Sequence, residues 1–132
     1  MTLQVRVDLA LGVPPYEQIR SQIAGHVGAG NLHPGDRLPT VRDLAADLGV
    51  AAGTVARAYR ELEQSGLVQT RRRLGTVVAD GAGSEGAGQE LQRSAAALVR
   101  AARIEGLSDD AVLDLVRGTL MAPGLPAPQV RD

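Results

Sequence analysis

The stretch from Leu38 to Gly66, LPTVRDLAADLGVAAGTVARAYRELEQSG, constrains the fold more than any other part of the sequence. Thr40 precedes the apolar positions of a first short helix and Gly49 follows them, and these residue types are typical of helix starts and stops. A second helix is predicted to begin two or three residues later and to end with the stretch. Two short helices joined by a turn this tight, at about residues 41–60, have the outline of a helix-turn-helix.

The second predicted helix has two different faces. At about 100° per residue, its larger apolar side chains fall on one side and can pack into a core: Val55, Ala58, Tyr59 and Leu62. The opposite side carries a different set: Gly53, Arg57, Arg60 and Gln64. This second side is either a solvated surface or a face that reads a DNA groove. The small residues at positions 51–54 favour DNA reading, because they let the start of a helix approach bases and phosphates closely.

A basic hairpin is predicted directly after the two helices. Two short strands over residues 67–79 flank three consecutive arginines, Arg71, Arg72 and Arg73. Three like charges at the end of a hairpin repel one another unless an anion lies nearby. A solvated turn is the alternative, but beside a helix-turn-helix we expect a wing that contacts phosphates or the minor groove.

The segment before residue 38 is expected to support this pair of helices. Leu3, Val5 and Val7 alternate with polar residues, which predicts a short, half-buried strand. A helix is then predicted to begin near Pro15, and its apolar stripe is expected in the core: Tyr16, Ile19, Ile23 and Val27.

A glycine-rich segment at 81–88 is predicted to be a flexible linker, which makes residues 1–80 one domain. Two further helices are predicted within 89–121, followed by a proline-rich tail at 122–132. Two helices of this size cannot form a core alone, so their apolar stripes must pack against the first domain or a second copy of the chain. The expected fold is mainly α, a winged helix-turn-helix domain with a small antiparallel β-wing and a two-helix C-terminal extension.

Composition excludes several classes of protein. The chain lacks cysteine, which rules out disulfides, a thiol nucleophile and cysteine-based zinc sites. The only histidines are His26, expected to be a packed or capping side chain, and His33, expected in an exposed turn. Because catalytic spacings, phosphate-binding loops and metal clusters are also missing from the sequence, we expect no enzyme activity, no metal and no cofactor.

The net charge of −1 and the pI near 6.1 argue weakly against nucleic acid, but the position of the basic residues matters more. All 14 basic residues are arginines, a bias that a GC-rich genome also produces. No apolar run approaches the roughly 20 residues needed to span a bilayer, and the first residues do not form a signal peptide. We therefore expect a cytoplasmic protein without a membrane partner.

Over about residues 12–80 the sequence resembles the GntR family of bacterial transcription regulators. The C-terminal part, and the segment from Thr54 to Leu62, are similar to its small YtrA-type subfamily, in which two helices replace the effector-binding domain and serve dimerisation. The residues that carry the resemblance follow one another in the family's order: Pro15–Ile19, Pro34–Thr40, Arg42–Ala45, Leu48–Val50, Thr54, Val55, Tyr59, Leu62, Glu63, Gly66–Val68, Gly75 and Thr76.

The resemblance implies that Arg42 contacts a guanine, that the start of the second helix reads the groove and that the wing reaches the minor groove. The candidate DNA-binding residues are Arg37, Thr40, Arg42, Ala52, Gly53, Thr54, Arg57, Arg71, Arg72, Arg73, Gly75 and Thr76. Two positions depart from the family pattern. Ala51 stands where a Ser or Asn usually caps the helix, and Arg73 stands at a usual glycine of the wing.

The resemblance also implies a homodimeric repressor that binds double-stranded, palindromic operator DNA, with control of transport genes and of its own gene. A small effector between protomers has no residue signature in the sequence. The alternative function is a winged-helix module that acts through protein–protein contacts.

Overall fold

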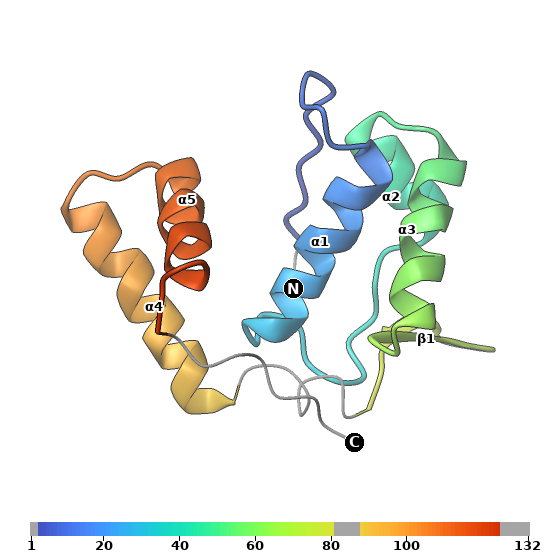
Figure 1. Cartoon of the computed structure of the whole chain (residues 1–132). Helices are drawn as coiled ribbons and strands as arrows, with labels where there is room; N and C mark the ends of the chain where they lie inside the picture. Colours follow the sequence, from blue (N-terminus) through green and yellow to red (C-terminus); the bar gives the residue numbers. More distant parts are fainter. Residues whose placement is uncertain (1–2, 81–87, 125–132) are drawn as a thin grey trace. The chain divides into compact units, whose positions relative to one another are not determined.

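The computed structural model describes residues 3–80 and 88–124, which divide into two compact units, Met1–Gln92 and Arg93–Asp132. Figure 1 colours the helices and strands in chain order. The described chain forms three helices and a two-stranded hairpin followed by two more helices. This confirms the expected mainly helical, winged helix-turn-helix fold. The elements in chain order are α1 (Pro15–Gly28), α2 (Val41–Leu48), α3 (Ala52–Gln64), β1 (Val68–Arg71), β2 (Gly75–Val78), α4 (Gln89–Ile104) and α5 (Asp109–Leu120).

The core of the first unit forms where α1, α2 and α3 meet the hairpin. Ile19 and Ile23 of α1 are fully buried, as are Val55 and Leu62 of α3. The apolar stripe predicted for α3 is therefore confirmed, as is that of α1 apart from Tyr16. Val68 of β1 closes the core from the side of the hairpin. Burying this face fixes α3 with its opposite, polar face toward solvent.

The ends of α2 follow the chemistry predicted for them. The side-chain oxygen of Thr40 accepts a hydrogen bond from the backbone N–H of Asp43 at 3.1 Å, which caps the first turn. Gly49 ends the helix with φ of +69°, a left-handed conformation that glycine adopts without steric cost. The tight turn between α2 and α3 therefore depends on Gly49.

The first residue before α3 provides a stability test. Ala51 has the extended backbone of an N-cap (φ −67°, ψ 145°) but no side chain that can accept a hydrogen bond. Ala51→Ser is expected to stabilise the folded state by about 1 kcal/mol, since serine satisfies one free N–H of the first turn. Thermal unfolding measures the effect. Ala46→Ser, within α2, is the matched control and should lower stability slightly; equal shifts for both variants would contradict the capping argument.

The hairpin forms as predicted, with β1 and β2 antiparallel and Val68 opposite Val78. Its turn contains Arg72, Arg73 and Leu74. The left-handed φ of +76° falls on Gly75, and no described residue other than glycine has a positive φ. Arg73 therefore occupies its unusual position without backbone strain, because the turn places its left-handed residue at Gly75.

The strand predicted at Leu3–Val7 is wrong. The segment is extended, and Leu3, Val5 and Val7 pack against the core as their alternation predicted, but no strand of the described chain pairs with it. Its backbone instead bonds to side chains of α1. Arg6 donates its N–H to Gln22 Oε1 at 2.8 Å and accepts a hydrogen bond from Gln22 Nε2 at 2.6 Å.

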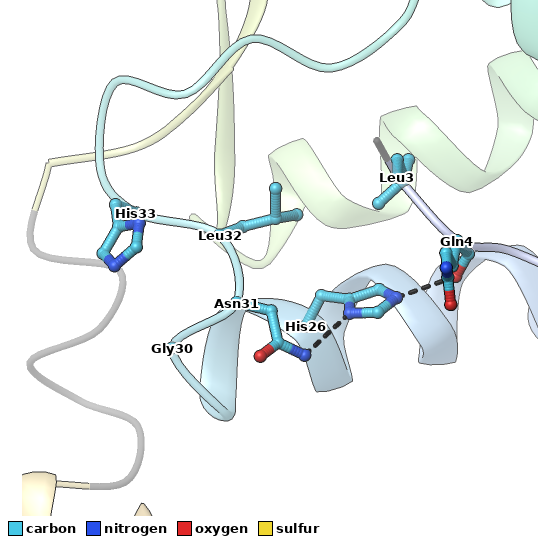
Figure 2. Close-up of a pocket in the computed structure, with 7 residues that line it drawn as sticks. All are labelled: Leu3, Gln4, His26, Gly30, Asn31, Leu32 and His33. Carbon is cyan, nitrogen blue, oxygen red and sulfur yellow. Dashed lines mark hydrogen bonds between the residues drawn. The ribbon is translucent and has the colours of Figure 1, made fainter. Parts of the chain in front are cut away.

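The same arrangement repeats one helical turn away on either side. Gln18 accepts from the N–H of Asp8 and donates to its carbonyl, at 2.8 and 3.0 Å. On the other side, His26 Nε2 lies 2.8 Å from the carbonyl oxygen of Gln4, and Asn31 bonds to the other ring nitrogen. The dashed lines in Figure 2 mark both contacts. Two residues of extended chain and four residues of helix both advance by about 6 Å, so polar side chains on α1 can replace a partner strand.

In the second unit, the end of α4 and the start of α5 are joined by a turn in which Gly106 has φ of +82°. Ser108 caps α5 by accepting from the N–H of Ala111 at 3.1 Å. Ala102 is the one buried residue among the described positions of this unit. Of the predicted linker, 81–87 lie outside the described residues, as do 125–132 of the predicted tail. In the described part of the chain, every helix is too short or too polar to cross a membrane.

Candidate nucleic-acid interface

The start of α2 presents two of the predicted residues to solvent. Thr40 is held as the N-cap, and Arg42 follows in the first helical turn with an exposed side chain. Arg42 forms no ion pair with any described residue, so its guanidinium is free to bind an anion or a base edge.

The start of α3 is open. Ala52 and Gly53 are exposed, and a Cβ built on Gly53 would meet no atom within 4 Å. The fold itself therefore does not require glycine at this position, whereas close approach of a ligand to the backbone would explain it. Thr54 is half-buried beside them, and its N–H closes the first turn on Ala51.

Arg57 lies on the exposed side of α3 and contacts α1. Its Cζ lies 3.7 Å from the centre of the Tyr16 ring, a cation–π contact. Tyr16, predicted to be a core residue, is only half-buried, and part of its ring packs against the core. The prediction for Tyr16 was therefore incomplete, because it did not foresee the contact with Arg57.

The wing is braced by a predicted residue. Arg37 donates from Nε to the carbonyl of Leu74 at 2.9 Å, which ties the turn of the hairpin to the loop before α2. Arg72 and Arg73 are exposed in that turn. The backbone carbonyl of Thr76 accepts from Leu38 N at 2.8 Å and gives the wing a second attachment.

Arg71 differs from its two neighbours. Residues alternate across a strand, so Arg71 shares a face with Gln69, whereas Thr70 faces α3 and bonds to Glu63. Arg71 forms an ion pair with Asp80 at 3.4 Å. The structure thus does not bring Arg71 together with the residues on the α3 side of the wing.

Arg60 belongs to this surface but is not among the candidate DNA-binding residues predicted from the sequence. Arg60 is exposed and lines a groove of about 150 Å³ between α3 and the wing, with Thr70 and Thr76 on the other wall. It forms no ion pair with the described residues. Its position beside Arg57 on the exposed helix face was the signal that could have identified it.

Tyr59 connects the two helices of the motif. Its hydroxyl donates to the carbonyl of Pro39 at 2.7 Å, directly before the cap of α2, and burial raises the pKa of Tyr59 above its ordinary value. Tyr59→Phe is expected to cost about 1 kcal/mol of folding free energy, because the carbonyl of Pro39 loses its partner. Chemical denaturation measures this cost. Tyr16→Phe is the control, since the Tyr16 hydroxyl forms no hydrogen bond with the described residues; an equal loss for the two variants would argue against the role of Pro39.

A charged cluster lies where α1 and α3 pack together. The hydrogen bond between Glu17 and Arg20, 2.8 Å from Nε to Oε2, lowers the pKa of the Glu17 carboxyl and raises the pKa of Arg20. The charge of Glu61 on α3 raises the pKa of Arg20 further, and one buried carboxylate oxygen of Glu61 has no hydrogen-bond partner among the described residues.

A hollow of about 420 Å³ lies at the other end of α1, where Leu3, His26 and Leu32 contribute to its walls (Figure 2). Both ring nitrogens of His26 are already engaged in the contacts described above. Across residues 3–80 and 88–124, no three His, Asp or Glu side chains come together as metal ligands.

The helix pair, the hairpin and the arginines around them define a winged helix-turn-helix protein. Residues 15–78 match the model of the bacterial regulatory proteins of the gntR family. The chain belongs to the GntR family, whose members are transcriptional regulators and not enzymes.

Two relatives illustrate the similarity. The chain is 60% identical over 74 residues to the HTH-type transcriptional regulator Rv1152 of Mycobacterium tuberculosis, covering 56% of this chain and 61% of that protein. It is 38% identical over 78 residues to the HTH-type transcriptional repressor YtrA of Bacillus subtilis, covering 59% and 60%. The matched region spans about 60% of the length of these curated relatives.

Two solved structures extend the comparison. YtrA from Sulfolobus acidocaldarius, a GntR-family transcription factor, is 30% identical with a TM-score of 0.55, covering 89% of this chain and 97% of that one. The DNA-binding domain of AraR, solved in complex with operator ORX1, is 28% identical with a TM-score of 0.52, covering 60% and 99%. The two YtrA proteins, at 38% and 30% identity, support placement in the YtrA-type subfamily.

Proposed function

We propose that this protein is a sequence-specific transcriptional repressor that acts in the cytoplasm by binding operator DNA and blocking a promoter. The observation that carries the proposal is the exposed surface formed by the start of α2, the start of α3 and the braced wing. Arg42, Arg57 and Arg60 are exposed on its helices, and Arg72 and Arg73 are exposed on its wing. The AraR structure in complex with an operator supports this use of the same fold.

The contacts divide into two kinds by their chemistry. Arg72 and Arg73, at the end of a hairpin, suit phosphates or the minor groove and supply affinity that does not depend on sequence. Arg42 and the start of α3 supply discrimination, because a guanidinium can bind a guanine edge through two hydrogen bonds. Ala52 and Gly53 contribute by allowing close approach rather than by reading bases.

We further propose that residues 89–121 hold two copies together, so that two DNA-binding domains (residues 1–80) meet a palindromic operator. Apolar side chains on α4, on α5 and at the C-cap of α5 are exposed: Leu91, Ile104, Leu113, Leu120 and Met121 are between 51% and 86% exposed. A second copy would bury these stripes, which the two helices cannot cover by themselves.

Selection of genomic DNA fragments by the full chain tests this function. Recovered fragments should share a palindrome, and titration should show tighter binding to it than to a scrambled duplex of equal length. Sedimentation should give two chains per operator. The YtrA-type resemblance extends the proposal to transport genes and the protein's own promoter as targets. Fragments without a common sequence, bound no better than random DNA, would refute the proposal and favour a module for protein contacts.

A further inference from the structure

We propose that Tyr16 is a positioning residue for DNA recognition: its ring holds Arg57 in place on the surface of α3, so that α1 contributes to sequence reading through another residue. This inference rests on the function proposed above. It adds a role for a helix that otherwise serves as support.

The contact geometry suits this role. With Cζ 3.7 Å from the ring centre, the guanidinium of Arg57 is in van der Waals contact with one face of Tyr16. The N–H donors of a guanidinium lie in its own plane, so a contact with a ring face leaves them available. Arg57 forms no ion pair with the described residues, and its side chain remains exposed.

The ring also competes with a second partner for Arg57. Glu61 lies four residues further along α3, the spacing at which oppositely charged side chains meet on a helix. Within residues 3–80 and 88–124, one carboxylate oxygen of Glu61 also has no hydrogen-bond partner. Without the ring, Arg57 is free to turn toward Glu61, and DNA binding then has to break that pair and order a flexible side chain.

The position of Tyr16 in the fold stabilises its contact with Arg57. Tyr16 lies in the first turn of α1, directly after Pro15, and part of its ring packs against the core. One turn later, Arg20 of α1 lies close enough to Glu61 of α3 for the charge of Glu61 to raise the pKa of Arg20. The ring is therefore held by the core while it also contacts Arg57.

A double-mutant cycle tests the proposal on the selected operator. Tyr16→Leu should weaken binding by about threefold when Arg57 is present and have no effect in the Arg57→Ala background, the size expected of an exposed cation–π contact. Tyr16→Phe, which keeps the ring, should bind as the wild type does. Equal losses from Tyr16→Leu in both backgrounds, or a loss from Tyr16→Phe as large as from Tyr16→Leu, would overturn the proposal.

If the Tyr16→Leu variant does not fold, the wild-type protein can be tested directly by NMR. The NMR resonances of the Arg57 guanidinium should be shifted upfield by the ring and should show restricted motion before DNA is added. Unshifted, mobile Arg57 resonances would overturn the proposal. Failure of the proposed DNA-binding function would give a different result from failure of the Tyr16 proposal. In that case, the wild-type protein would bind no selected duplex better than a scrambled one.

Discussion

Arg42→Ala is expected to weaken binding to the selected operator by about 1–3 kcal/mol, or roughly 5- to 150-fold, with little effect on random duplex. Arg42 is exposed in the first turn of α2, where the cap at Thr40 fixes the direction of the helix. Its guanidinium has no competing ion pair among the described residues. Loss of a two-bond contact to guanine should relax the preference at one base position.

Competitive titration of operators that vary one base at a time measures this effect. Arg42→Lys is the matched control, because it keeps the charge but loses the two-bond geometry, so it should retain affinity for random DNA and lose discrimination. Equal losses of affinity for specific and random DNA would assign Arg42 to phosphate contact instead.

The double variant Arg72→Ala/Arg73→Ala is expected to weaken binding to every sequence and to reduce the salt dependence of binding. Each lost phosphate contact lowers the slope of log K against log salt by about 0.9, so two contacts lower it by about 1.8. Between 50 and 200 mM salt, the affinity of the double variant should therefore fall by about tenfold less than the affinity of the wild type. Discrimination between operator and scrambled duplex should change little.

Titrations across this salt range measure the slope. Arg71→Ala is the control within the same hairpin, since Arg71 pairs with Asp80 on the face away from α3 and should change the slope less. A slope unaffected by the double variant would exclude the wing turn from phosphate contact.

The parts of the fold that the sequence predicted well depend on local chemistry. Thr40 and Gly49 mark the ends of α2 through capping and a left-handed turn, both decided within a few residues. The stripes of α1 and α3 follow from helical spacing alone. The wing follows from two apolar runs around a turn. The sequence did not show which residue of the turn adopts a left-handed conformation; the backbone dihedral angles of the structure place it at Gly75.

The remaining features depend on which segments meet. Alternation at Leu3–Val7 predicts extended chain with one buried side, but it does not identify the partner, and here side chains of α1 take that role. In the same way, spacing placed Tyr16 on the buried stripe without showing that Arg57 lies against its ring. The sequence also did not show that Arg71 faces away from α3, because this depends on the register of the two strands.

Amide hydrogen exchange of the full chain, with and without the selected operator, tests the DNA-binding surface most directly. The account predicts that operator slows exchange at residues 40–43, at 52–57 and in the wing turn at 72–76. It predicts little change in the extended segment at 3–8. Slowed exchange confined to 3–8 or to α4 and α5, with the helix starts and the wing unchanged, would contradict it.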